Sequence, residues 1–304
     1  MIGMYDKYQQ KDNNPKYEIK EELAKPYICF QFSNIFGNGR KEVGMDKKIF
    51  FKSKKGNKLC GVLVSPDNKN HPVVILCHGF HSTKDNNTNT RLKEILKDKN
   101  IATFRFDFFG HGESAGKFED ITVSQAVDDL LSAIDLLKKK GYKKIGLIGA
   151  SFGGLTSLLA ASKSKDLLFL GLKCPAVNFL EIELTHRTKE NLQDWKREGF
   201  SYYKNEEGET YRLNYKFFQD LKKNNGFVVA DKISIPTLLV HGDADDIVPV
   251  KQSEYLYKLI PNCKLAIIPG ADHRFLNPPA TKKEKGGFDA MVELLFNFVI
   301  ENTK

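Results

Sequence analysis

Short apolar runs recur along the chain from residue 73 to residue 270, separated by amphipathic or polar stretches. Each run has the length of a β-strand and is apolar almost throughout, which is typical of strands covered on both faces. The runs are Val73 to Cys77, Ile101 to Phe106, Lys144 to Gly149, Leu167 to Cys174, Thr237 to Gly242 and Leu265 to Gly270. Alternating strands and helices favour a parallel sheet with right-handed crossovers. The predicted fold class is therefore α/β, with a mainly parallel central sheet and helices on both faces.

The best-marked helix lies between the second and third runs. Thr122 and Gln125 have the spacing of a capping box, and the apolar residues that follow recur at helical spacing. Lys138 to Lys140 suit the negative C-terminal end of a helix dipole, and Gly141 suits the left-handed position beyond the last turn. The pattern predicts a helix that begins after Thr122 and ends before Gly141.

The two ends of the expected domain differ from this alternation. Residues 1–45 are rich in Lys, Glu, Asn and Gln without a sustained period, and they are predicted to be an N-terminal extension. From Lys48 onward, two β-rich runs flank a Lys-Lys-Gly-Asn turn, which indicates a hairpin at the antiparallel edge of the sheet. The α/β domain is therefore expected over residues 46–304.

Residues 175–235 lack a clear strand-helix unit but are dense in aromatic side chains. So long a stretch is unlike a bare loop, so we expect an inserted cap subdomain of helices, with a hairpin across Asn205 to Glu209. Because it leaves after one strand and returns before the next, it should roof the C-terminal ends of the strands and set acyl preference. Its aromatic side chains are predicted either to form walls of a pocket or to be the insertion's own core.

The sharpest motif is Gly149-Ala150-Ser151-Phe152-Gly153, which follows an apolar strand and precedes a helical run. This G-x-S-x-G context is that of a nucleophile elbow, where small neighbours permit a strained turn that lifts the serine hydroxyl above the sheet. A serine hydroxyl is a poor nucleophile at neutral pH and needs a base, which an acid must orient. The motif predicts Ser151 as a nucleophile with both partners later in the chain.

Acid and base candidates follow the last two apolar runs. Asp243, Asp245 and Asp246 lie just after Gly242, and His273 lies three residues after Gly270. This order and placement fit the Ser, acid, His series at the C-terminal edge of an α/β sheet. The carboxylates lack the spacing and terminal Glu of a calcium loop, so no metal site is predicted there.

Five further histidines lack the placement expected of a catalytic base. His78, His111 and His241 each precede a glycine at a strand end or turn, where local hydrogen bonding is expected, and His71 and His186 have no motif around them.

Together these residues resemble the α/β-hydrolase superfamily. More narrowly, the chain is similar to cinnamoyl and feruloyl esterase-like, serine aminopeptidase-like and monoacylglycerol lipase-like hydrolases. The resemblance is carried by the elbow at Ser151, the two loops just described, and two further runs, His78-Gly79-Phe80 and Asp107-Phe108-Phe109-Gly110-His111-Gly112-Glu113-Ser114.

The resemblance implies the roles of individual residues. The fifth residue of an H-G-x-x-D-x-x-V-P loop is the triad acid, which is Asp245 here, with Asp246 and then Asp243 as alternatives. The backbone amides of Phe80 and Phe152 are the implied donors to the oxyanion. Gly79 would permit the close approach of the backbone that the Phe80 donor requires. The alternative for Phe80 is an exposed aromatic side chain on a loop. Acyl transfer by Ser151, Asp245 and His273 requires no metal, nucleotide or organic cofactor. The residues that bind the substrate are not identified.

The predicted function is hydrolysis of small-molecule carboxylic esters, with aromatic or medium-chain acyl groups favoured. Peptidase, thioesterase and monoacylglycerol lipase activities on the same fold are the alternatives, since the fold does not fix the substrate. A non-catalytic binding member remains a further alternative, although no triad residue is missing. A serine at the elbow argues against chemistry that uses an aspartate nucleophile there.

Charge and cysteine content restrict the partners. The net charge of +9 could attract nucleic acid or an anionic membrane, but only seven of the 47 basic residues are Arg and the lysines are dispersed, so no nucleic-acid partner is expected. Five scattered cysteines without a C-x-x-C pair suggest neither a disulfide framework nor a zinc site. No signal-length or membrane-length apolar run is evident, so a cytoplasmic location without a membrane span is expected. The oligomeric state, including a homodimer, is left open.

Overall fold

The computed structural model describes residues 46–66, 71–205, 208–276 and 286–304, all within a compact unit from Glu42 to Lys304. The extension predicted over residues 1–45, which includes Cys29, lies outside the described residues.

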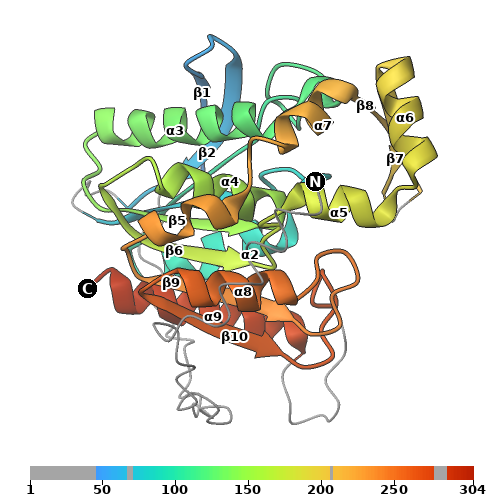
Figure 1. Cartoon of the computed structure of the whole chain (residues 1–304). Helices are drawn as coiled ribbons and strands as arrows, with labels where there is room; N and C mark the ends of the chain where they lie inside the picture. Colours follow the sequence, from blue (N-terminus) through green and yellow to red (C-terminus); the bar gives the residue numbers. More distant parts are fainter. Residues whose placement is uncertain (1–45, 67–70, 206–207, 277–285) are drawn as a thin grey trace. The chain divides into compact units, whose positions relative to one another are not determined.

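An eight-stranded sheet forms the centre of this unit, in the spatial order β1-β2-β4-β3-β5-β6-β9-β10 (Figure 1). Its strands are β1 (Lys47–Lys52), β2 (Lys58–Val64), β3 (Val73–Cys77), β4 (Ala102–Phe106), β5 (Ile145–Ala150), β6 (Leu167–Lys173), β9 (Thr237–Gly242) and β10 (Cys263–Ile268). Only β1 with β2 and β2 with β4 pair antiparallel within this sheet. The predicted mainly parallel sheet with an edge hairpin is confirmed, because every predicted apolar run contributes a strand.

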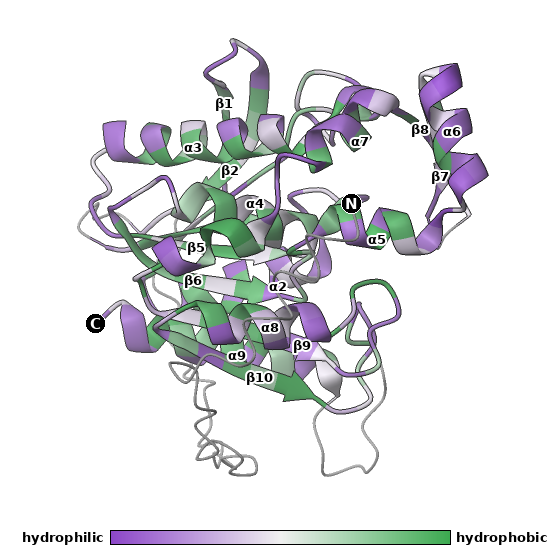
Figure 2. Cartoon of the chain, in the orientation of Figure 1, coloured by the Kyte–Doolittle hydropathy of each residue, from purple (hydrophilic) through white to green (hydrophobic). Residues whose placement is uncertain are grey.

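Helices cover both faces of the sheet, which accounts for the continuous apolar runs. One core cluster includes side chains of α3, α4 and α8, and a second includes side chains of α2 and α9. The bounds are α2 (Asn87–Lys97), α3 (Val123–Lys139), α4 (Phe152–Ala161), α8 (Lys251–Leu259) and α9 (Gly287–Asn302), with a short 3-10 turn η4 (Phe118–Asp120) before α3. All residues of α4 are buried, as expected for a helix that is apolar on every side and packs between the sheet and α3 (Figure 2).

The predicted ends of α3 are confirmed, but the capping box is not. Thr122 Oγ1 accepts a hydrogen bond from the Gln125 backbone N–H at 3.1 Å. The Gln125 side chain instead donates to Asp129 Oδ1 at 2.8 Å, so the reciprocal bond back to Thr122 is not made. Asp129 is a buried carboxylate, and a carboxylate attracts an amide N–H more strongly than a neutral acceptor does. Gly141 has a φ of +97°, the left-handed conformation expected there.

Between β6 and β9 the chain forms a group of short elements that includes a separate two-stranded sheet. They are α5 (Phe179–His186), α6 (Lys189–Glu198), β7 (Phe200–Lys204), β8 (Thr210–Asn214), α7 (Tyr215–Leu221) and the 3-10 helix η5 (Gly226–Lys232). The hairpin predicted across Asn205 to Glu209 joins β7 to β8. In contrast to α4, helix α6 is mostly polar and buries only Trp195 (Figure 2). Assignment of this segment as a cap subdomain stays a prediction.

Candidate active site

The strands that precede the predicted site residues are parallel, so their carboxyl ends meet at one edge of the sheet. Ser151 directly follows β5, Asp245 lies in the loop after β9, and His273 lies beyond β10. Phe80 lies in the loop after β3, the neighbour of β5. The order of the strands thus brings residues from distant parts of the sequence to the same edge.

Ser151 has the backbone of a strained strand-to-helix turn. Its φ is +53° and its ψ is −115°, a conformation that non-glycine residues rarely adopt. A side chain at Gly149 would overlap the Gly153 carbonyl oxygen, and one at Gly153 would overlap the His78 carbonyl oxygen. The motif therefore needs its glycines for space, as predicted from the sequence.

Asp245 and His273 form a hydrogen-bonded pair. His273 Nδ1 lies 2.7 Å from Asp245 Oδ2, and the Asp245 side chain is fully buried. Asp243 instead accepts a hydrogen bond from the Gly270 backbone N–H at 2.6 Å, and Asp246 is exposed. Of the three candidate acids, Asp245 is the one that contacts His273.

The end of β6 connects Ser151 to the His273 loop. The Lys173 carbonyl oxygen accepts from the Ser151 N–H at 2.9 Å, while Lys173 Nζ donates to the His273 carbonyl oxygen at 3.1 Å. Cys174 Sγ also lies 3.5 Å from that oxygen. Within the described ranges there is no hydrogen bond between the Ser151 hydroxyl and the His273 ring. Such bonds often tighten only when substrate is bound.

Buried polar contacts determine the charge of the Asp245-His273 pair. Burial opposes ionisation of Asp245, but hydrogen bonds from His241 and His273 outweigh it and hold the pKa of Asp245 well below its usual range. Burial also lowers the pKa of His273, while the adjacent Cys174 and the hydrogen-bonded Asp245 raise it, with a net increase above the ordinary 6.5. Asp245 is therefore a stable carboxylate suited to orient the imidazole.

Cys174, Asp245 and His273 also place three possible ligand atoms within 4.8 Å of one another, the one such group found among the described residues. The Asp245 and His273 atoms already face each other across their hydrogen bond. A carboxylate-imidazole pair explains the arrangement, so we assign no metal to it.

The loop after β3 lies beside Ser151. A Cβ built on Gly79 would lie 3.7 Å from Ser151 Cβ, which is an ordinary contact. An alanine would fit this space, and the predicted close approach of the backbone beside Gly79 to the oxyanion stays a prediction. Across the described part of the chain, the backbone N–H groups of Phe80 and Phe152 make no hydrogen bond to the protein. Phe152 is the first residue of α4, so its amide also lies at the positive end of a helix dipole.

Residues of the Asp107-to-Ser114 run brace this loop. His111 Nε2 lies 2.6 Å from the Phe80 carbonyl oxygen, and Asp107 accepts hydrogen bonds from both the backbone and the ammonium group of Lys84 at 2.8 Å. A side chain at Gly112 would overlap the Asp107 carboxylate, and φ there is +47°. The sequence of the run indicated neither the ion pair of Asp107 with Lys84 nor the contact of His111 with Phe80. The spacing of Asp107 from Gly110 and Gly112 was the one sequence feature that indicated a tight turn around the carboxylate.

The Phe80 side chain is buried and not exposed on the loop. Its ring centroid lies 5.2 Å from those of Phe179 and Phe217 and 5.5 Å from that of Tyr203. These three residues belong to α5, α7 and β7 of the segment between β6 and β9. The segment therefore contacts the loop whose amide is the predicted oxyanion donor.

Other aromatic side chains of the segment form its own core. Trp195 is buried, donates its Nε1–H to the Leu213 carbonyl oxygen at 3.0 Å, and packs against Tyr215 and Phe218. These residues therefore belong to the core of the insertion, and the prediction that other aromatic residues form walls of a pocket stays a prediction.

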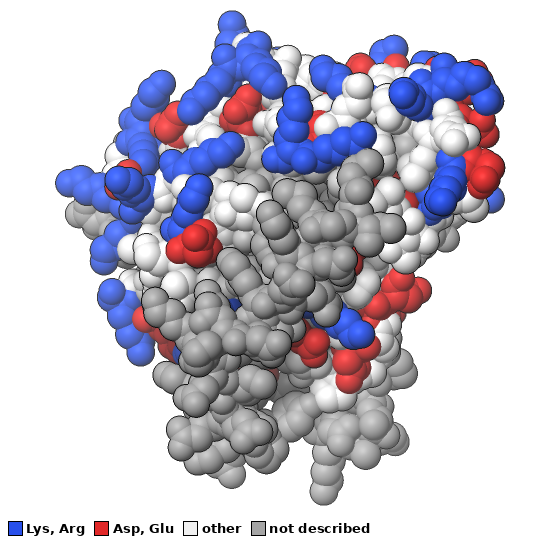
Figure 3. All heavy atoms as spheres, viewed as in Figure 1, with Lys and Arg blue, Asp and Glu red and all other residues white. Residues whose placement is uncertain are grey.

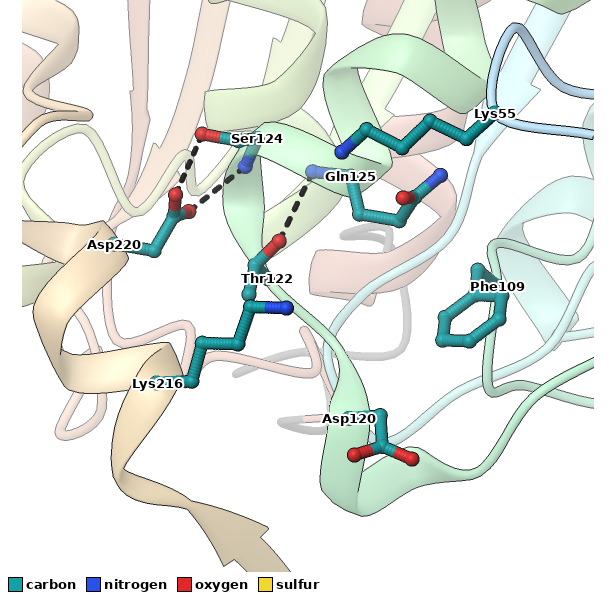
Figure 4. A pocket seen from close by; sticks show the side chains of 8 residues that line it. All are labelled: Lys55, Phe109, Asp120, Thr122, Ser124, Gln125, Lys216 and Asp220. Carbon is teal, nitrogen blue, oxygen red and sulfur yellow. Dashed lines mark hydrogen bonds between the residues drawn. The ribbon is translucent and has the colours of Figure 1, made fainter. Parts of the chain in front are cut away.

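A separate pocket of about 310 Å³ lies where the start of α3 meets α7 (Figure 4). Its lining residues are Lys55, Phe109, Asp120, Thr122, Ser124, Gln125, Lys216 and Asp220. Asp220 accepts hydrogen bonds from the Ser124 backbone and hydroxyl at 2.8 and 2.6 Å. Asp220 thereby occupies the Ser124 amide at this helix end, and no predicted triad residue lines the pocket.

Three further features concern the surface charge, the cysteines and the helices. On the face shown in Figure 3, Lys and Arg side chains are dispersed, with acidic side chains among them. The described cysteines, Cys60, Cys77, Cys174 and Cys263, are all free. Among the described residues, no helix is long and apolar enough to cross a membrane.

Comparisons with known proteins identify the family of the chain. A model of the prolyl oligopeptidase family matches residues 89–290. The chain is 24% identical over 213 residues to human serine hydrolase BPHL, covering 66% of this chain and 72% of that protein. It is 27% identical over 228 residues to the mitochondrial palmitoyl-protein thioesterase ABHD10 of Bos taurus, covering 73% of this chain and 71% of the relative.

Solved structures show the same fold. Est1E from Butyrivibrio proteoclasticus with ferulic acid bound superposes with a TM-score of 0.70 and 28% identity, covering 84% of this chain and 98% of Est1E. Mouse α/β hydrolase domain-containing protein 10 has a TM-score of 0.69 at 23% identity, covering 84% and 97% of the two chains, and supports the fold alone. The predicted fold class is confirmed.

Proposed function

Because the chain belongs to the prolyl oligopeptidase family of α/β-hydrolases, we propose that it is a serine esterase with Ser151, Asp245 and His273 as its catalytic triad. The observation that carries this proposal is the strained Ser151 elbow at the sheet edge where the buried Asp245 is hydrogen-bonded to His273. No other aspartate of the loop makes this contact among the described residues.

In the proposed mechanism, His273 removes the proton from Ser151 Oγ as the oxygen attacks the ester carbonyl carbon. The amides of Phe80 and Phe152 stabilise the negative oxygen that develops. His273 then returns its proton to the departing alcohol, which leaves an acyl group on Ser151. Water attacks this acyl-enzyme with His273 again as the base, and the acid is released with the hydroxyl restored.

The proposed substrates are carboxylic esters with an aromatic or medium-chain acyl group. Est1E, the relative that binds ferulic acid, supports an aromatic acyl group. The second candidate is a thioester, which the palmitoyl-protein thioesterase supports. Both reactions use the same acyl-enzyme and differ in the atom that leaves.

A cytoplasmic location, expected from the sequence, is also part of this proposal.

A substrate panel separates these candidates. We expect methyl ferulate, and p-nitrophenyl esters with medium or aromatic acyl groups, to give higher kcat/KM than thioesters with the same acyl groups. A thiolate leaves more readily than an alkoxide, so a preference for methyl ferulate would come from recognition of the ester by the site. Peptide p-nitroanilides should react at least about a hundredfold more slowly, since an amide needs protonation of a poorer leaving group. Preference for thioesters would assign the second candidate. Preference for the anilides would contradict the esterase proposal.

We further propose that residues 175–235 form a cap whose contact with Phe80 supports the oxyanion loop. Phe217 packs against the Phe80 ring, whereas its neighbour Phe218 packs against Trp195 and Tyr215. Both side chains are buried, so each change to leucine should cost a similar stability, on the order of 1 kcal/mol.

Phe217→Leu is expected to lower kcat about tenfold on a small acetyl ester as well as on larger esters, because it loosens the loop that carries the Phe80 amide. Phe218→Leu is the matched control and should leave kcat within about twofold. Steady-state kinetics, with thermal unfolding of both variants, measure this. If Phe217→Leu changes only the acyl preference and leaves kcat on the acetyl ester unaltered, the cap acts on specificity alone and the proposed support of the oxyanion loop is wrong.

A further inference from the structure

His241 is a buried histidine at the end of β9, four residues before the triad acid. Its Nε2 lies 2.9 Å from the Val248 carbonyl oxygen and 3.1 Å from Asp245 Oδ2. Its Nδ1 lies 2.7 Å from Ser253 Oγ on α8. The ring is therefore held on both sides, and one side faces the carboxylate that orients His273.

These partners determine where the proton of His241 lies. Both neighbours of Nε2 are oxygen atoms that only accept hydrogen bonds, so Nε2 must carry a hydrogen. The Ser253 hydroxyl can donate to Nδ1, which leaves the neutral tautomer fully paired. Ser253 is fully buried, so its hydroxyl has little alternative. The Ser253-His241 contact thus directs an N–H group at the oxygens on the other side of the ring.

Asp245 receives donors at both of its oxygens. Oδ1 accepts from the backbone N–H groups of Ile247 and Val248 at 3.0 and 2.8 Å. Oδ2 faces both His273 Nδ1 and His241 Nε2. A buried carboxylate is costly unless its lone pairs are satisfied, and the His241 N–H is the only side-chain donor besides His273 that reaches it among the described residues.

We propose that His241 is a positioning residue for the triad, which shares its Nε2–H between Val248 and Asp245 and thereby fixes the Asp245 oxygen that orients His273. This inference rests on the proposed function. It assigns to His241 a role in the reaction beyond the local hydrogen bonding expected from the sequence.

The direction in which loss of the His241 N–H changes the pKa of His273 follows from charge. Without the His241 N–H, the negative charge on Oδ2 is less stabilised, so Asp245 attracts the imidazolium form of His273 more strongly. The pKa of His273 then rises. Since the base must be neutral to take the serine proton, kcat/KM falls as pH drops through that pKa, and its acid limb moves to higher pH.

The other groups that face this pair stay in place when His241 is changed. Cys174 lies beside His273, and the Lys173 ammonium group donates to the His273 carbonyl oxygen. Their effects are present in the wild type and the variants alike. A shift between the two therefore reports the loss of the His241 contact.

The test compares the pH profiles of three variants on one p-nitrophenyl ester. His241→Leu removes the donor and is expected to lower kcat by about tenfold to a hundredfold with KM within about twofold, because a loosened carboxylate misaligns His273. The acid limb of kcat/KM should rise by about half a pH unit. His241→Gln places an amide N–H near the former Nε2 and should restore the acid limb to the wild-type pH.

Leu239→Ala is the packing control, since Leu239 is fully buried on the same strand and has no polar atom. It should lower the Tm and leave the acid limb unchanged. An unfolded fraction that is constant with pH scales the profile without moving its midpoint, so the Tm of each variant is also measured at both ends of the pH range. The downfield proton resonance of the Asp245-His273 hydrogen bond should also shift in His241→Leu and return in His241→Gln.

An acid limb of His241→Leu at the wild-type pH, or an equal shift in Leu239→Ala, would overturn the inference. These results differ from a failure of the proposed function. That failure would appear as ester hydrolysis that persists in a Ser151→Ala variant, whatever residue 241 is.

Discussion

Replacement of Ser151 by alanine is expected to abolish ester hydrolysis, with kcat reduced by at least about 10⁴-fold. The variant loses the atom that attacks the carbonyl carbon, and no other group in the proposed mechanism can form the acyl-enzyme. The fold should be retained, because the change removes one oxygen from a partly exposed turn and buries nothing new. The strained φ of +53° is also no harder for alanine than for serine.

Ser157→Ala is a control for this experiment, since Ser157 lies on α4 six residues farther along and is fully buried. It should keep activity within about twofold. Initial rates on a p-nitrophenyl ester, with circular dichroism and Tm for both variants, give the result. A Ser151→Ala variant that keeps more than a few per cent of the wild-type rate would exclude Ser151 as the nucleophile.

Asp245→Asn is expected to lower kcat by about 10⁴-fold, the size of effect seen when a triad acid becomes an amide. The amide can present an N–H to His273 and favour the wrong imidazole tautomer. It also removes the negative charge that stabilises the imidazolium during attack. KM should change little, because Asp245 is buried and does not face the substrate.

The neighbouring aspartates provide the controls. Asp243→Asn keeps an oxygen that can accept the Gly270 N–H, and Asp246→Asn changes an exposed side chain, so each should lower kcat by less than about fivefold. Kinetics of the three variants side by side decide between the candidate acids. If Asp246→Asn is the damaging change, the acid assignment is wrong by one position in the loop.

Much of the fold could be predicted because its elements are encoded locally. Fully buried strands such as β3 and β9 appear as unbroken apolar runs, and their predicted ends agree with the structure. The ends of α3 were predictable from Thr122 and Gly141, which act within one turn. The elbow was predictable from its motif, although its two glycines are needed for different reasons. Gly149 leaves room for the Gly153 carbonyl oxygen within the turn, whereas Gly153 leaves room for the His78 carbonyl oxygen of the loop after β3.

What could not be predicted depends on contacts between distant segments. The Gln125 amide was expected to return to Thr122, but a buried carboxylate one turn onward attracts it instead. The His241 ring meets Asp245 only because the loop after β9 folds back over the end of its own strand. The choice of Asp245 over its neighbours was made from a family resemblance, and spacing alone could not separate carboxylates within four residues of one another.

The predicted roles of the segment between β6 and β9 illustrate the same limit. Aromatic content indicated a folded insertion, yet it could not separate residues that pack within the segment from those that reach Phe80. That distinction arises from the packing of α5, α7 and β7 onto the loop after β3, which lies far earlier in the sequence. Hydrophobic packing has no sequence pattern that identifies its partner.

The most direct test of the proposed mechanism is mass spectrometry of the protein after reaction with a fluorophosphonate, which modifies only a serine made nucleophilic by its base. We expect a single phosphonyl adduct on the peptide that contains Ser151, formed at a rate that falls by orders of magnitude in Asp245→Asn. An adduct on a different residue, or no adduct on a folded protein that still hydrolyses esters, would contradict the assignment of Ser151 as the nucleophile.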